Sequence, residues 1–245
     1  MKKAVCVLLS LLLWLFAGCK QTEKQEIVVF AAASLQESLP QIARDYMADH
    51  DVEIVLNFDS SGTLRTQILE GAQCHIFLSA GQKQVDGLGM EQFDLLENQV
   101  TLVVPDGNPA GIQSYEDLKN ALTEGGVLMA MGNADVPVGQ YTKKILDYFG
   151  LSEADLAAKG LLTYGSNARE VTLQVAEGTV DCGIVYATDA IAADLTVVDT
   201  ATEAMCGRVV YPAAMLSADA AEFFRYLKSP AAKAVLEAAG FTPLG

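Results

Sequence analysis

Residues 27–47 read IVVFAAASLQESLPQIARDYM and combine a strand pattern with a helix pattern. The first four residues are all apolar, as expected for a short strand in a sheet that is covered on both faces. After Ser34, apolar residues recur three or four positions apart, which marks the buried face of a helix. These residues are Leu35, Leu39, Ile42, Ala43, Tyr46 and Met47. The stretch therefore predicts a strand, a junction that carries Ser34, and an amphipathic helix.

The same alternation recurs along the rest of the chain. Strand patterns are found at 52–58, 76–78, 100–104, 127–131, 182–186 and 209–216. Helix patterns begin near Ser60, Ser114, Val138, Ala168, Thr188 and Ala220, and the last one extends to Ala239. Repeated strand–helix–strand units imply an α/β fold in which mostly parallel sheets are flanked by helices. A Pro/Gly/Asn turn at 105–109 indicates a domain boundary.

The composition excludes several classes of protein. The 245 residues are 51% hydrophobic, which excludes a disordered chain. Sixteen basic residues against 31 acidic ones give a net charge of −15, which argues against nucleic-acid binding. The two histidines and the absence of a CxxC pair leave little material for a metal site. Cys74, Cys182 and Cys206 allow either one disulfide and a free thiol or three buried thiols, and the sequence leaves this open.

The N-terminus resembles a bacterial lipoprotein signal. Lys2 and Lys3 precede an apolar run that ends at Gly18, and Cys19 follows directly. This predicts a cleaved signal over 1–18, a lipid-modified Cys19, and a polar tether over 19–25. An ordinary signal peptide with an incidental cysteine is the alternative. In either case the mature protein is expected outside the cytoplasm, and lipidation would anchor it to the cell membrane.

The junctions between strands and helices carry a recurrent chemistry. A helix N-terminus has unpaired N–H groups and a partial positive charge, so it attracts anions. Serines stand at the first two junctions, as Ser34 and as Ser60 and Ser61, and later junctions carry Val138-Gly139 and Ala168. Tyr186 ends a strand that faces the same side. If the junctions converge, they form a pocket of hydrogen-bond donors without a full positive charge.

Each of these residues also has an ordinary structural interpretation. Ser34 and Ser61 could be N-caps of their helices, and Gly139 could be a turn glycine. Tyr186 could be a core aromatic residue. Arginines could also clamp an anion, although surface or ion-pair roles are the commoner ones; they are Arg65, Arg169 and Arg208.

Four motifs in a fixed order make the pattern more specific. They read VFAAASL at 29–35, FDSSGTL at 58–64, VPVGQY at 136–141 and GIVYATD at 183–189. The chain in this respect resembles the molybdate-binding proteins of ABC transporters. The resemblance runs from Ile27 to the C-terminus, where AGFT at 239–242 also matches the family.

The resemblance implies a ligand set of five residues. Ser34 and Ser61 would donate hydrogen bonds through their hydroxyl and backbone N–H groups, Val138 and Ala168 through backbone N–H groups, and Tyr186 through its phenol. The family binds molybdate, and tungstate nearly as well, without a cofactor or a metal cation. It delivers the ion to a membrane permease, so we expect a monomeric binding protein and not an enzyme.

The resemblance also implies a periplasmic-binding-protein-like (type II) fold with two lobes. The first lobe is predicted over 26–104 and 209–245, because the last strand and helix should return to it, and the second over 105–208. The first two ligands would come from one lobe and the next two from the other. Tyr186 would close the site, and binding would shift a hinged open–closed equilibrium toward the closed form.

A lining of donors suits molybdate because this ion is fully deprotonated at neutral pH. Phosphate carries a proton and would need an acceptor, whereas sulfate would have to be excluded by its smaller size. Another tetrahedral oxyanion, such as sulfate or phosphate, is therefore the alternative ligand. A serine hydrolase with Ser34 or Ser61 as nucleophile and His75 as base is a remote alternative, since no G-x-S-x-G motif is present.

Five positions depart from the family pattern. Val138 replaces a common alanine, and Gly62 replaces a common serine or threonine. Cys74-His75 replaces a usual Ala-Asp pair, for which the sequence offers no explanation. Asp59 replaces a small residue; pointing inward it would repel a dianion, and we expect it instead to point outward as a helix cap.

Overall fold

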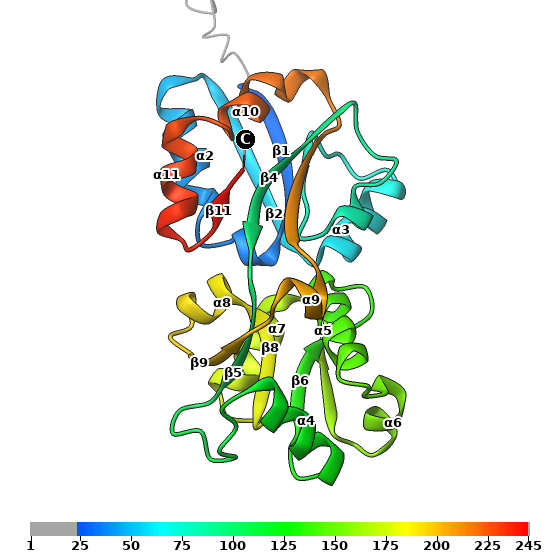
Figure 1. Cartoon of the computed structure of the whole chain (residues 1–245). Helices are drawn as coiled ribbons and strands as arrows, with labels where there is room; N and C mark the ends of the chain where they lie inside the picture. The colour runs from blue at the N-terminus through cyan, green and yellow to red at the C-terminus, as the bar shows by residue number, and fades with distance from the viewer. Residues whose placement is uncertain (1–23, 245) are drawn as a thin grey trace, which may run out of the picture.

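A computed structural model describes residues 24–244. The predicted signal over 1–18 and the predicted lipidation site Cys19 lie outside these residues. Within the described part, the strands form two sheets of six and five strands, which lie one above the other in Figure 1. None of the helices in this part has both the length and the apolar character needed to cross a membrane.

The first sheet and its helices form what we call the first lobe. Its strand order is β11-β4-β10-β3-β1-β2. The strands are β1 Gln25–Ala32, β2 Val52–Asp59, β3 Ile76–Leu78, β4 Glu91–Asn98, β10 Val209–Met215 and β11 Thr242–Pro243. The helices are η1 Ala33–Leu35, α2 Leu39–Asp49, α3 Ser61–Leu69, η2 Gln82–Gln84, η3 Ala218–Ala220, α10 Ala221–Tyr226 and α11 Pro230–Ala238. In Figure 1, α2 and α11 cover one side of the sheet and α3 the other.

The second sheet and its helices form the second lobe. Its strand order is β7-β6-β8-β5-β9. The strands are β5 Val100–Val104, β6 Met129–Gly132, β7 Leu162–Gly165, β8 Cys182–Tyr186 and β9 Thr196–Thr200. The helices are α4 Tyr115–Glu124, α5 Pro137–Tyr148, α6 Glu153–Ala158, α7 Ala168–Ala176, α8 Ala187–Ala192 and α9 Glu203–Cys206.

Both sheets are mixed, which corrects the expectation of mostly parallel sheets. In the first sheet β1 runs parallel to β2 and β3, whereas β10 runs antiparallel to β3 and β4. In the second sheet β6 is parallel to β7 and β8, whereas β5 is antiparallel to β8 and β9. The antiparallel strands β4, β5, β9 and β10 lie on the two segments that connect the lobes (Figure 1). None of the antiparallel pairs consists of two strands that follow each other through a single helix, so the rule that predicts parallel pairs does not apply to them.

The first crossover lies at Gln99, which corrects the predicted boundary at residue 104. β4 ends at Asn98 in the first sheet, and β5 begins at Val100 in the second, so 100–104 belong to the second lobe. The strand β4 has no counterpart among the predicted elements. Its side chains are mostly polar or partly exposed, so it gives no continuous apolar pattern.

Two predicted helices are also interrupted. Residues 220–239 form two helices, because Ser229 caps a new helix by accepting the Ala232 N–H and Pro230 takes the first helical position. In the first unit, η1 ends at Leu35 and α2 begins only at Leu39. These breaks leave the apolar faces of both regions directed at the first sheet.

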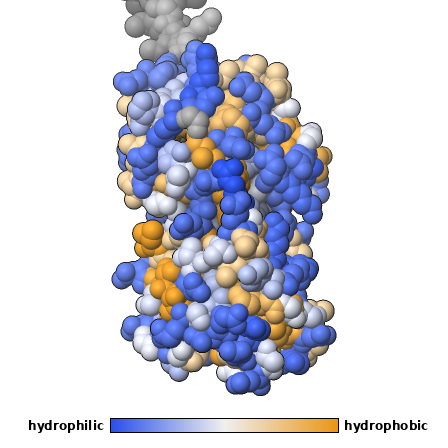
Figure 2. Space-filling model, viewed as in Figure 1, coloured by the Kyte–Doolittle hydropathy of each residue, from blue (hydrophilic) through white to orange (hydrophobic). Residues whose placement is uncertain are grey.

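Apolar side chains cover both faces of each sheet. One cluster on the first sheet joins Phe30, Phe77 and Ala214 to Leu64 of α3. On the second sheet, Val171 and Val175 of α7 pack with Ala130 and Val185. The largest cluster is continuous from the first lobe to the second. Figure 2 shows mainly hydrophilic residues on the viewed surface, with apolar residues exposed over α8 and β9.

Candidate functional site

A small cavity lies where the two lobes meet. It is lined by Ser34, Ser61, Ala168 and Tyr186, which are four of the five predicted ligands, and its volume is about 10 Å³. The fifth, Val138, is not among the lining residues, although Val136 and Pro137 just before it are. A space of this size is near the minimum for one water molecule, so the lobes are close together around it.

Ser34 lies inside η1, directly after β1. Its side chain is 7% exposed, and its Oγ lies 2.9 Å from Tyr211 Oη. The N-cap position of η1 is Ala32, and no side chain caps this helix. The N-cap interpretation of Ser34 is therefore wrong, and its hydroxyl is held by a buried tyrosine instead.

Ser61 is the first residue of α3. Its Oγ accepts a hydrogen bond of 3.0 Å from the Ala80 N–H, so its own proton is free for another acceptor. The N-cap of α3 is Ser60, whose Oγ accepts from the Thr63 N–H at 3.1 Å. The N-cap interpretation of Ser61 is therefore also wrong.

Asp59 is not the helix cap that the sequence suggested. Its Oδ1 accepts from the Ser60 N–H at 2.6 Å, and the residue is one of those that line the cavity. The adjoining departure, Gly62, has a clear steric role. A Cβ at this position would lie 2.2 Å from the backbone oxygen of Asp135 in the second lobe. The lobes therefore approach each other more closely here than any side chain at residue 62 would allow.

The second lobe directs two helix N-termini toward the first lobe. Val138 is in the first turn of α5, and Ala168 is the first residue of α7, so intrahelical bonding leaves their N–H groups without partners. Asn167 caps α7 by accepting the Glu170 N–H at 2.9 Å. Gly139 allows α5 to pack closely on the end of β6, since a Cβ there would lie 2.2 Å from the oxygen of Gly132. This role differs from the predicted close approach to a ligand.

Tyr186 lies at the end of β8 and is 1% exposed. Its Oη donates to the Ala80 oxygen of the first lobe over 3.5 Å, and its ring packs edge-on against Tyr211. Burial raises the pKa of both tyrosines well above the usual value for tyrosine. Both phenols therefore keep their protons at neutral pH and are available as donors.

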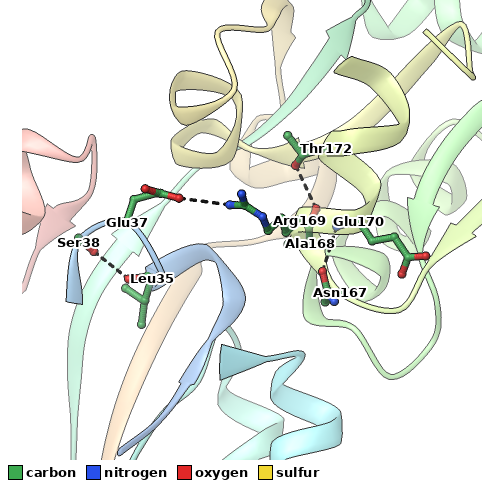
Figure 3. A network of polar contacts seen from close by, with 8 residues as sticks. All are labelled: Leu35, Glu37, Ser38, Asn167, Ala168, Arg169, Glu170 and Thr172. Carbon is green, nitrogen blue, oxygen red and sulfur yellow. Dashed lines mark hydrogen bonds and ion pairs between the residues drawn. The ribbon is translucent and has the colours of Figure 1, made fainter. Parts of the chain in front are cut away.

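The arginines serve structural contacts. Arg65 donates to the backbone oxygens of Gln84 and Asp86, and Arg208 is paired with Glu97. Arg169 of α7 forms an ion pair of 3.2 Å with Glu37, which joins the two lobes beside the cavity (Figure 3). The cavity itself is lined only by neutral residues and Asp59.

The remaining candidates for chemistry are accounted for by the fold. His75 Nδ1 accepts the Val28 N–H at 2.7 Å, so the ring completes the sheet at the start of β1 and is not a base beside Ser34. The three cysteines of the described region are free thiols, and burial raises the pKa of Cys74 to about 11 and that of Cys182 to about 12. Among residues 24–244, no cluster of His, Cys, Asp and Glu could hold a metal ion.

Sequence reasoning missed the residues behind the cavity. Tyr211 contacts the lining residue Ser34, Asn98 donates to Tyr211, and both are buried. Their signals are weak: Tyr211 looks like any core aromatic in a strand, and Asn98 is the middle one of three consecutive polar residues. Ala80, whose backbone contacts Ser61 and Tyr186, carries no side-chain signal at all.

Comparisons with known proteins agree with this architecture. The profile of the bacterial extracellular solute-binding protein family matches residues 27–242. YvgL of Bacillus subtilis, named as an ABC transporter substrate-binding lipoprotein, is 33% identical, and the alignment covers 93% of each chain. The molybdate-binding protein ModA of Haemophilus influenzae is 32% identical over 89% of this chain and 90% of its own.

A solved structure adds a match in three dimensions. It is described as the substrate-binding domain of a molybdenum ABC transporter from Clostridium difficile. Its sequence is 28% identical, its TM-score is 0.65, and the match covers 91% of this chain and 100% of that chain.

Proposed function

The chain belongs to the bacterial extracellular solute-binding proteins, in the molybdate-binding ModA family of ABC transporters, and on this premise we propose that its ligand is molybdate, with tungstate as a close analogue. The family is not enzymatic: its members bind a solute for transport. The observation that carries the choice of ligand is the cavity between the lobes, where Ser34, Ser61, Ala168 and Tyr186 come together.

The chemistry of these residues supports a deprotonated tetraoxoanion. Hydroxyl and backbone N–H groups donate hydrogen bonds, and molybdate offers four oxygens that only accept them. Each bond to a charged acceptor contributes roughly 1.5–3 kcal/mol. Several such bonds, less the cost of removing water from the ion, correspond to a Kd from about micromolar to nanomolar. Fixed helix N-termini increase the affinity further, because their N–H groups need little reorganisation when the ion binds.

The proposed mechanism is closure of a hinge at the two segments that connect the lobes. The ion would first contact one lobe in an open form and then be enclosed as the second lobe approaches. The tight cavity and the contact of Gly62 with Asp135 support closure, because a ligand can reach the site only when the lobes separate. A permease would recognise the closed form. A lipid on Cys19 would hold the protein at the membrane.

A thermal-shift series tests this proposal directly. A ligand at about 1,000 times its Kd stabilises the native state by about 4 kcal/mol, which corresponds to roughly 10 °C for a chain of this size. We expect such a shift with 1 mM molybdate or tungstate, and much smaller shifts with sulfate, phosphate and chromate. Equal shifts with sulfate, or none with molybdate, would contradict the proposal.

One observation favours a rival ligand. Asp59 lines the cavity and is the only acidic residue to do so among the described residues. A carboxylate there could accept the proton of hydrogen phosphate. In the same series, a larger shift with phosphate than with molybdate, reversed by Asp59→Ala, would establish this alternative.

A further inference from the structure

Two buried polar side chains lie behind Ser34, which itself lines the cavity, and we call these two residues the second row. Tyr211 of β10 is fully buried, and its Oη lies 2.9 Å from Ser34 Oγ. Asn98, the last residue of β4, donates from Nδ2 to Tyr211 Oη over 3.2 Å. The row therefore runs from the crossover between the lobes to the cavity.

The orientation of the Asn98 amide is fixed by its neighbours. The Gln99 N–H donates to Asn98 Oδ1 at 2.8 Å, and a backbone N–H can only donate. The oxygen of the amide must therefore face Gln99. Its nitrogen then faces Tyr211 and also donates to Thr188 Oγ1 of the second lobe at 2.9 Å.

The direction of the next bond follows from the number of protons. Tyr211 Oη accepts a hydrogen bond from Asn98 Nδ2, and it has a single proton of its own with which to donate one. A bound tetraoxoanion can only accept hydrogen bonds, so the Ser34 proton points to the anion and a Ser34 lone pair is left for Tyr211. We propose that Asn98 and Tyr211 are positioning residues that keep Ser34 a hydrogen-bond donor toward the ligand.

This order makes the pair a determinant of specificity. A fully deprotonated ion is satisfied by the Ser34 proton, whereas hydrogen phosphate needs an acceptor, and Tyr211 occupies one of the two lone pairs of Ser34 Oγ, which reduces its capacity to accept. Ser61 is held in the same way, since the Ala80 N–H donates to its Oγ. Burial also raises the pKa of Tyr211, so the phenol does not lose the proton that the arrangement requires.

The inference rests on the proposed function, and a double-mutant cycle tests it. Tyr211→Phe removes the hydroxyl and keeps the ring, so we expect molybdate to bind about tenfold more weakly in calorimetry. Ser34→Ala removes the donor itself and should weaken binding at least as much. If Tyr211 acts through Ser34, adding Tyr211→Phe to Ser34→Ala causes less than a twofold further loss. A merely structural role of Tyr211 would weaken binding equally in both backgrounds and would overturn the inference.

Phosphate provides a second readout. Tyr211→Phe frees a lone pair of Ser34, so the affinity for molybdate relative to phosphate should fall, whereas loss of packing would weaken both ions alike. Tyr115→Phe is the matched control, because Tyr115 is a fully buried tyrosine of the second lobe whose hydroxyl has no partner in the described structure. Its affinities should equal those of the wild type.

A second variant keeps the test decisive if Tyr211→Phe fails to fold. Asn98→Asp keeps the shape and the bond from Gln99 but accepts the Tyr211 proton, so Ser34 must donate to Tyr211 and not to the ion. The new carboxylate also repels a dianion whatever the direction of the Ser34 bond, so molybdate affinity should fall more than tenfold and the loss should be clearly smaller when Ser34→Ala is also present. An unchanged affinity, or an equal loss with and without Ser34, would contradict the inference.

The outcomes separate this inference from the proposed function. If the wild type binds sulfate or another deprotonated ion instead of molybdate, the proposed function is wrong, and the same cycle with that ion still tests Tyr211. If the wild type binds molybdate but the cycle is additive, the function stands and the positioning role is wrong. If no oxyanion binds, both are wrong.

Discussion

The two lobes present different kinds of donor to the cavity between them. The first lobe offers the hydroxyl groups of Ser34 and Ser61, and each of these has a neighbour behind it, Tyr211 or the Ala80 N–H. The second lobe offers the N-terminal turns of α5 and α7 and a single hydroxyl, that of Tyr186 at the end of β8. A hydroxyl can donate or accept, so a second row must fix its direction, whereas a backbone N–H can only donate. The hydroxyl donors therefore need a neighbouring residue that fixes their direction, whereas the backbone N–H donors do not.

The largest effect is expected where a hydroxyl of the first lobe is removed. Ser61→Ala should lower molybdate affinity by about 2–4 kcal/mol, or at least thirtyfold, because it removes a donor to a charged ion and leaves the Ala80 N–H without its acceptor. Titration calorimetry measures the loss. Ser114→Ala is the control, since it removes an N-cap from α4 in the second lobe and should cost stability without changing affinity. An affinity within threefold of the wild type would show that Ser61 is not a ligand.

The next effect concerns the closeness of the lobes rather than either set of donors. Gly62→Ala should weaken binding by about 1–3 kcal/mol, because the new Cβ meets the Asp135 oxygen only when the lobes are closed. In the open form alanine is the better helix residue, so stability without ligand should stay equal or rise slightly. Calorimetry and urea unfolding together measure the two opposite changes.

Gly126→Ala is the matched control for that variant. Its nearest contact would be the Ala121 oxygen at 4.0 Å, within the same lobe, so no clash arises on closure. We expect wild-type affinity. If both variants lose affinity equally, or if Gly62→Ala is less stable than the wild type without ligand, the glycine at residue 62 is not needed for closure of the lobes.

A third effect concerns a buried carboxyl group of the second lobe. Asp189 of α8 has a buried Oδ2 without a partner in the described structure, and burial raises its pKa to about 7, although Arg169 lowers it. An unfolded chain gives this acid a pKa near 3.8, so the native state holds the proton more tightly. Its contribution to stability is therefore fully present below about pH 4 and is lost as the pH rises toward 7.

Asp189→Asn should remove this loss of stability at higher pH, because an asparagine side chain does not titrate. Full linkage over that shift gives about 4 kcal/mol, and we expect about 1–2 kcal/mol because the residue as a whole is half-buried, although Oδ2 is not exposed, and solvent screens part of its charge. Urea unfolding should find the variant more stable than the wild type at pH 8 and equal to it near pH 4. A difference that does not change with pH would mean that the carboxyl of Asp189 does not titrate in this range.

The contrast between the lobes also explains what the sequence could reveal. Ser34, Ser61, Ala168 and Tyr186 lie in motifs at strand ends, where the order of strands and helices predicts convergence, and all four line the cavity. The supporting residues Tyr211 and Asn98 come from strands of the crossovers, whose direction strand–helix alternation does not predict. The Pro/Gly/Asn turn at 105–109, taken as the boundary, also assigned 100–104 to the wrong lobe, because only pairing with β8 and β9 places that strand.

The smallest effect on affinity is expected at Val138, where the resemblance assigned only a backbone donor. The side chain is fully buried in the second lobe, so Val138→Ala should lower the free energy of unfolding by about 1–3 kcal/mol. The N–H of the first turn of α5 remains in place, so the Kd for molybdate should change less than twofold. Urea unfolding and calorimetry on one preparation measure both quantities. Loss of affinity comparable to that of Ser61→Ala would mean that the N-terminus of α5 contributes through the side chain of Val138, and its assignment as a backbone donor would be wrong.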